Sequence, residues 1–233
     1  MIHFGLLLFP RLTQLDLTGP AQVFSRCPEA RVDLIWKTTE PVPTGDGWSL
    51  VPNMTFADCP QLDVLCVPGG QGQTEQMDDE ETLDFLRRQA VGARFVTSVC
   101  TGSLLLGAAG LLDGYRATCH WMSLDQLPLF GAVPVAERVV RDRNRITGGG
   151  VTAGIDFGLT VAAELHGAQI AQRIQLLLEY APEPPYQSGT PTQAGPELVQ
   201  ESLQLAAANQ ARRREASQRA AERLKLRGEL PSP

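Results

Sequence analysis

The sequence predicts an α/β protein in which a mainly parallel sheet lies between two layers of helices. Two observations lead to this fold class. Short apolar runs alternate with segments of helical composition through residues 1–181, which is the pattern of a doubly wound sandwich. In the segment LDVLCVPGG, residues 62–70, an apolar run is closed by two glycines, as expected of a strand buried on both faces of a parallel sheet.

The elements follow one another in a regular order. Apolar and β-branched runs predict strands at residues 3–9, 32–38, 62–70 and 93–99, an edge hairpin around 48–54, and a hairpin or two successive strands within 135–147. Helix signals predict a first helix that begins near Gly19 and Pro20, then helices over 78–90 and 101–112, and a longest helix that ends at about Tyr180.

The chain divides into a body and a tail. Residues 1–181 are expected to form one domain, because 233 residues with 43% hydrophobic content can bury a full core. A Pro/Gly-rich stretch, residues 182–197, is predicted to be a linker or a surface loop. Residues 198–227 are predicted to form a C-terminal helix.

One uncharged stretch invites a comparison with a membrane span. None of the 18 residues from 95 to 112 is charged, and this length is close to the length that crosses a bilayer. The composition changes along it, however, from β-branched FVTSV to polar CTGS to LLLGAAGLL. We therefore interpret it as a strand, a tight turn and a helix, and expect no membrane association.

Charge is unevenly distributed. The formal net charge is −6, but residues 212–233 hold seven of the 20 basic and three of the 26 acidic residues. An acidic body argues against nucleic acid as the main partner, because binding of phosphates needs clustered Lys and Arg. The first residues have no basic region of the kind that opens a signal peptide, so we expect a cytoplasmic protein.

The cysteines point to one reactive thiol. Their number is five, which is odd, and they form no CxxC pair and no Cys/His cluster, so neither a disulfide framework nor a zinc site is expected. Cys100 follows a predicted strand and directly precedes a helix, which is the layout of a nucleophile elbow. The start of a helix stabilises a thiolate. We expect the other four cysteines to be packing residues.

Partners for this thiol are expected at the same edge of the sheet. The backbone amide of Thr101 and the amides of Gly69 and Gly70 could donate to charge that develops on a substrate. Asp16, in the predicted loop after the first strand, is either an acid with apolar neighbours or a helix cap. His120, at the end of a predicted strand, could border the pocket and contact the substrate.

Three motifs resemble one superfamily. LDVLCVPGG, FVTSVCTGSLLLGAAGLLDGYRATCHW and VVRDRNRITGGGVTAGIDFGL, with the acid near the first strand, resemble the DJ-1/PfpI superfamily, which implies a flavodoxin-like, class I glutamine-amidotransferase-like sandwich. Histidine directly follows the cysteine in the PfpI type, whereas this chain has Thr101, so a Cys-His peptidase is not expected. AraC-like regulators carry a similar domain, but about 35 residues after the linker are too few for two helix-turn-helix units.

Within the superfamily, the residues look most like the isonitrile hydratase branch. This resemblance implies that water is added to a small isonitrile to give an N-substituted formamide, through a thioimidate on Cys100 and with Asp16 as the proton donor. Thr101 would orient the substrate or the water. The resemblance implies a homodimer, and no metal or organic cofactor is needed. Two alternatives stay open: glyoxalase or deglycase chemistry on 2-oxoaldehydes, and a redox or stress sensor with an oxidisable thiol.

Overall fold

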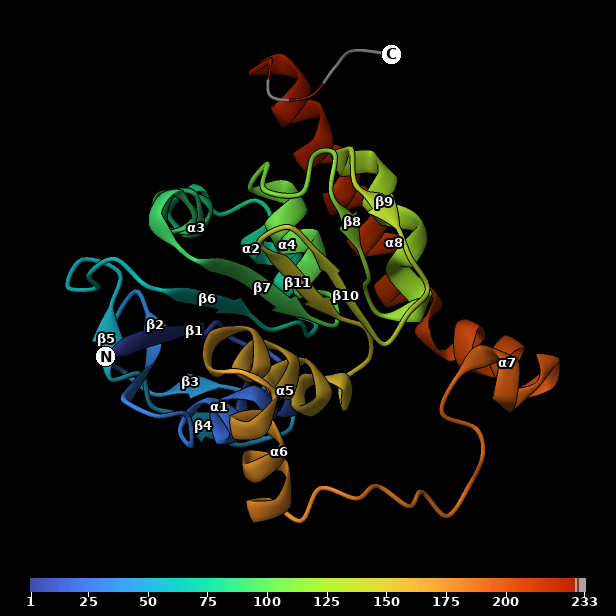
Figure 1. The fold of residues 1–233 in the computed structure, drawn as a ribbon. Helices are drawn as coiled ribbons and strands as arrows, with labels where there is room; N and C mark the ends of the chain where they lie inside the picture. Colours follow the sequence, from blue (N-terminus) through green and yellow to red (C-terminus); the bar gives the residue numbers. More distant parts are fainter. Residues whose placement is uncertain (229, 231–233) are drawn as a thin grey trace.

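A seven-stranded sheet forms the centre of the protein (Figure 1). The computed structural model describes residues 1–228 and residue 230. The order of the strands is β10-β11-β7-β6-β1-β2-β5, and every neighbouring pair is parallel except β10 and β11. The predicted, mainly parallel sheet is therefore confirmed. The strands of the sheet are β1 (Ile2–Leu7), β2 (Ala30–Trp36), β5 (Met54–Thr55), β6 (Val64–Val67), β7 (Phe95–Val99), β10 (Val139–Asp142) and β11 (Arg145–Gly148).

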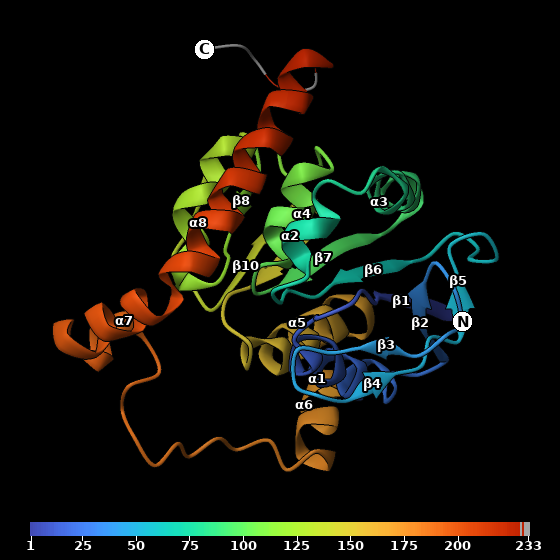
Figure 2. The same ribbon diagram turned by 180° about the vertical axis from the view of Figure 1, so that it is seen from behind.

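Helices cover both faces of the sheet, as Figures 1 and 2 show from opposite sides. One layer contains α1 and α5, which pack on each other, with α6 against α5. The other layer contains α2, α3 and α4, and the C-terminal helix α8 lies against α2 and α4. The helices are α1 (Gln14–Phe24), α2 (Gln73–Gln76), α3 (Glu80–Gly92), α4 (Gly102–Ala108), α5 (Ala153–His166), α6 (Ala168–Leu177), α7 (Pro191–Ala194), α8 (Pro196–Leu226) and the 3-10 helix η1 (Trp121–Phe130).

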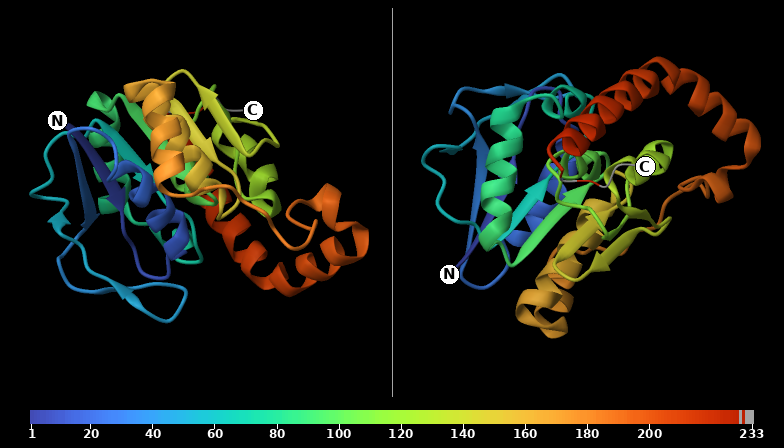
Figure 3. Two further views of the ribbon diagram at one scale, coloured as in Figure 1. Left: turned by 60° about the horizontal axis from the view of Figure 1, so that its bottom comes forward. Right: turned by 90° about the horizontal axis from the view of Figure 1, so that it is seen from above.

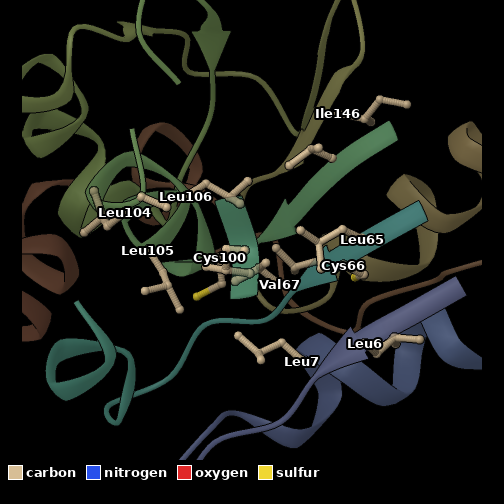
Figure 4. Packing of buried hydrophobic residues seen from close by; sticks show 14 of the residues in the cluster. Leu6, Leu7, Leu65, Cys66, Val67, Cys100, Leu104, Leu105, Leu106 and Ile146 are labelled. Atoms are coloured by element: carbon tan, nitrogen blue, oxygen red, sulfur yellow. The ribbon is translucent and has the colours of Figure 1, made fainter. Parts of the chain in front are cut away.

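The hydrophobic core lies on both sides of the two central strands. Every residue of β6 is buried, and so are four of the five residues of β7. Leu6 of β1, Val67 of β6 and Leu104 of α4 are completely or almost completely buried (Figure 4). Neither strand therefore has a solvent-exposed face, which is why apolar and polar residues do not alternate in their sequences.

Two predicted elements differ from the structure. The edge hairpin is made by β3 (Val42–Pro43) and β4 (Ser49–Leu50), whereas β5 leaves it and joins β2 as a parallel edge strand. The longest predicted helix is broken at Gly167, which separates α5 from α6 and has a φ of +86°. This backbone conformation favours glycine and ends a helix. The longest helix is instead α8.

The first helix begins earlier than predicted. Its first residue is Gln14 rather than one near Gly19, so Asp16 lies in the first turn of α1 and not in a loop. Pro20 is inside the helix, although proline is usual at a helix start. The missing amide of Pro20 removes only one hydrogen bond from the helix.

The C-terminal helix has two distinct halves. Ala216, Ala220 and Leu224 of the second half are buried against the body. The first half and α7 project from the body (Figure 3), and Leu203 and Leu205 are exposed there.

The uncharged stretch of residues 95–112 contains strand β7, a turn and helix α4, as predicted. Among the described residues, no helix combines the length and apolarity of a membrane span.

Candidate active site

Cys100 occupies a strained turn between β7 and α4. Its φ is +57°, which is unusual for a residue with a side chain. The turn is held in place because the Cys100 amide donates to the Gly148 carbonyl at 3.0 Å. A Cβ on Gly102 would lie 2.2 Å from the Val67 carbonyl oxygen, so only glycine lets α4 start this close to β6. The predicted nucleophile elbow is confirmed in its geometry.

The elbow opens into a small cavity of about 170 Å³. Cys100 is 5% exposed, and in Figure 4 its sulfur lies at the end of the sheet, next to α4. The cavity is lined by Thr13, Gly70, Gln71, Cys100, Thr101, His120, Val151, Gln210 and Arg213. A larger cavity, of about 330 Å³, lies between α1 and α5 and holds no cysteine, histidine or acid among its described lining residues. Cys100, Thr101 and His120 of the predicted site therefore line the smaller cavity.

Asp16 is completely buried beside this thiol. Its Oδ2 accepts a hydrogen bond from the Gly69 amide at 2.9 Å, whereas Oδ1 has no partner at ordinary distances among the described residues. Burial raises the pKa of the Asp16 carboxyl to about 7, against the opposing effects of the Gly69 amide and the Cys100 thiol. Asp16 can therefore hold or release a proton near neutral pH.

The Cys100 thiol does not have the low pKa that the start of a helix predicts. Burial raises its pKa well above the usual value, and the charge of Asp16 raises it further. The Thr101 amide and Arg213 act in the opposite direction but more weakly. Desolvation therefore outweighs the stabilisation that the start of α4 gives to a thiolate. Because two negative charges are unfavourable here, Cys100 and Asp16 share one proton above about pH 7.

The glycine turn after β6 donates hydrogen bonds to Asp16 and Thr101. The Gly69 amide is occupied by Asp16, and the Gly70 amide donates to the Thr101 hydroxyl at 3.1 Å. A Cβ on Gly69 would lie 2.5 Å from the Thr101 amide nitrogen and 3.0 Å from Asp16 Oδ2. Glycine is therefore required for this close approach. Of the two glycines, only Gly70 lines the cavity, so donation to a substrate stays a prediction for this turn.

His120 borders the cavity, and the other two histidines lie elsewhere. Its Nδ1 accepts from the Met122 amide at 3.3 Å. Burial lowers the pKa of His120, and Arg213 lowers it further, so the imidazole is neutral at pH 7. His3 pairs with Asp33 at 2.6 Å, and His166 is the last residue of α5.

The remaining cysteines have raised thiol pKa values. Burial raises the pKa to about 11 for Cys27 and Cys59 and to about 12 for Cys66 and Cys119. Three of them are buried, whereas Cys59 is half-buried. Cys100 shares the raised pKa, but none of these four cysteines is among the lining residues of its cavity, so a packing role stays the prediction for them.

Arg213 and Gln210 were not among the predicted site residues. Both come from α8, and Arg213 is only 7% exposed. The spacing in the sequence could have predicted its burial. Arg213 lies three residues before Ala216, on the apolar face that continues to Ala220 and Leu224. A charged residue on that face has to be buried when the helix docks.

Comparison with known proteins places this site in a family. The model described as "DJ-1/PfpI family" matches residues 5–164. An isonitrile hydratase of Pseudomonas putida is 56% identical over 226 residues, which are 97% of this chain and 99% of that protein. The crystal structure of a ThiJ/PfpI family protein from Pseudomonas syringae matches with a TM-score of 0.90 and 43% identity, over 93% of this chain and 90% of that one. An HTH-type transcriptional regulator of Pseudomonas aeruginosa is 35% identical over 137 residues, which are 58% of this chain and 37% of the regulator.

The shared proton predicts a measurable change in thiol reactivity. Asp16→Asn removes the charge that raises the pKa of Cys100, so the midpoint for alkylation of Cys100 by iodoacetamide should move to lower pH. Quantitative mass spectrometry of the Cys100 peptide over a pH series measures this midpoint. Cys59 is the internal control, because its pKa responds to Asp33 and Arg31 rather than to Asp16. An unchanged or higher midpoint for Cys100 would contradict the coupling.

Proposed function

The chain belongs to the DJ-1/PfpI family, and we propose that it is an isonitrile hydratase, which adds water to an isonitrile and forms an N-substituted formamide. The observation that carries this proposal is the burial of Asp16 next to Cys100, which itself lines a small cavity. The identity of 56% with the Pseudomonas putida isonitrile hydratase, over nearly the whole of both chains, supports the same reaction.

The first half of the reaction uses the proton that Cys100 and Asp16 share. As the Cys100 sulfur bonds to the terminal carbon of R–N≡C, the Asp16 carboxylate accepts the thiol proton and passes it to the same carbon. The product is the thioimidate R–N=CH–S–Cys100, and Asp16 is left as a carboxylate. Pre-association of thiol and acid in a buried site makes this a proton transfer within the protein.

The second half returns the proton. Water adds across the C=N bond of the thioimidate, so that its oxygen bonds to carbon and Asp16 moves one of its protons to nitrogen. The C–S bond then breaks, the hydroxyl proton passes to Asp16, and R–NH–CHO leaves. Thr101, which lines the cavity and whose hydroxyl accepts a hydrogen bond from the Gly70 amide, would orient the substrate or the attacking water.

The raised thiol pKa bears on the rival functions. A redox sensor depends on a thiolate that is exposed and easily formed, whereas Cys100 is buried and its pKa is raised. Glyoxalase or deglycase chemistry would use the same cysteine and acid. Assays with methylglyoxal and with an isonitrile distinguish that activity from the proposed isonitrile hydration.

We also propose that the protein is a cytoplasmic homodimer without a nucleic-acid partner. The family resemblance motivates the dimer, and the projecting half of α8 offers exposed Leu203 and Leu205 for contact with a second copy. A chemistry that uses a free thiol suits the reducing cytoplasm. Sedimentation equilibrium tests the dimer, and a mass of one chain at micromolar concentration would contradict it.

Removal of either member of the pair should strongly reduce hydration. With n-butyl isonitrile, Cys100→Ala should lose at least about 10³-fold in kcat, because the bond-forming atom is gone. Asp16→Asn should lose about 10²- to 10⁴-fold, as expected for a general acid–base. Formamide production is followed by NMR or chromatography.

Cys59→Ser is the matched control, because Cys59 lies outside the cavity; it should keep the activity of the wild type. Full activity in Cys100→Ala or in Asp16→Asn would refute the mechanism. Turnover of methylglyoxal by a wild type that leaves the isonitrile unchanged would refute the proposed function itself.

A further inference from the structure

The C-terminal helix brings a buried cation to the cavity that holds Cys100. Arg213 of α8 is 7% exposed and lines the cavity together with Cys100 and Thr101. Its position is close enough to lower the pKa of Cys100, Cys119 and His120. A guanidinium this deeply buried loses most of its hydration, which is costly unless a partner replaces the water.

Within the described part of the chain, no carboxylate replaces it. Three more exposed arginines of the same helix pair with acids, Arg214 with Asp125, and Arg219 and Arg223 with Asp78, whereas the exposed Arg212 donates to the Asn209 side chain. Arg213 makes no ion pair with any described residue, although its guanidinium is buried and theirs are more exposed. Since buried charges are normally paired, the missing partner is expected to be a ligand.

Two neutral amides hold this guanidinium in place. Arg213 Nε donates to Gln73 Oε1 at 3.2 Å, from α2. With the Gln210 amide turned so that its nitrogen donates to the Met122 carbonyl, its oxygen accepts from Arg213 Nη1 at 3.0 Å. Figure 2 shows α2 and α8 side by side. The two glutamines fix the plane of the guanidinium without neutralising its charge, which is how a binding group is pre-organised.

The cavity around Arg213 is suited to a small anion. Its described lining contains neither aspartate nor glutamate, and His120 is neutral at pH 7. Asp16 is buried behind this lining and is not part of it. The cavity of about 170 Å³ admits only a compact ligand. A planar carboxylate matches the fork of a guanidinium through two parallel hydrogen bonds, and a small carboxylate is a compact anion.

We propose that Arg213 binds a carboxylate of the substrate, so that the enzyme acts on small isocyano carboxylates whose isonitrile carbon reaches Cys100. This inference rests on the proposed hydratase function and names its substrate class. The guanidinium would replace lost water with two parallel hydrogen bonds to the carboxylate. Neutral isonitriles would react at the same thiol but without this contact.

Isocyanoacetate and its methyl ester form a matched pair of probes. Wild type should have a kcat/KM for isocyanoacetate that is about 10- to 100-fold above that for the ester, because a charge-assisted hydrogen bond is lost with the ester. Arg213→Gln should lose about 10- to 100-fold more with isocyanoacetate than with the ester, whose turnover changes only through the effect of Arg213 on the Cys100 pKa. Arg213→Lys keeps the charge and should lose less than Arg213→Gln.

Arg214→Gln is the control, since Arg214 is adjacent on α8 but lies outside the cavity; it should behave as wild type with both probes. Turnover of the ester and an unchanged melting temperature establish that the Arg213 variants are folded. Should they fail to fold, inhibition of wild-type ester turnover provides the same test: N-formylglycine should inhibit about tenfold more strongly than its methyl ester.

Several outcomes would overturn the inference. Equal losses with both probes in Arg213→Gln would mean that Arg213 acts on Cys100 rather than on a carboxylate. A wild type that converts the ester as fast as isocyanoacetate would also reject the carboxylate site but keep the hydratase. If wild type converts neither probe nor n-butyl isonitrile, the proposed function fails instead.

Discussion

The Cys100 thiol and the Asp16 carboxyl are buried together at the carboxyl end of the sheet, where little water can solvate two negative charges. Burial raises the pKa of Asp16 to about 7 and that of Cys100 well above its usual value. The consequence is a pair that loses one of its two protons at about pH 7 and keeps the other at higher pH. Each half of the proposed reaction moves this proton, from the acid to the isonitrile carbon and from water back to the acid. The chemistry therefore depends on burial more than on an intrinsically acidic thiol.

The fold supplies this burial with few residues. Gly102 lets α4 approach β6, and the strained backbone of Cys100 lifts its side chain to the edge of the sheet. Gly69 brings its amide to Asp16 and leaves room for Thr101. α8 then closes the cavity with Arg213, from a position 113 residues after the cysteine. The catalytic pair comes from the body of the domain, whereas the charge that selects the substrate is proposed to come from the C-terminal helix.

The sequence predicts those parts of the site that depend on neighbouring residues. The elbow around Cys100 can be predicted from the sequence because a strand, one residue and a helix follow one another directly. Strands β6 and β7 can be predicted because both of their faces are buried, so apolar and polar residues do not alternate along them. Arg213 was missed because its role depends on how a distant helix docks. The acidity of Cys100 was misjudged because the helix start is local, whereas desolvation depends on the whole fold. The start of α1 was misplaced because Pro20, usually a residue of the first turn, lies inside this helix.

The pH dependence of kcat/KM for n-butyl isonitrile, which does not titrate, tests the shared proton most directly. Below about pH 7 both Cys100 and Asp16 are protonated, and no group accepts the thiol proton; above it the pair holds one. We therefore predict that kcat/KM rises with pH through about 7, reaches a plateau, and falls only at much higher pH, where the second proton is lost. Asp16→Asn should lack the rise near pH 7. A wild-type kcat/KM that falls as the pH rises through 7, or a rise that persists in Asp16→Asn, would contradict this account.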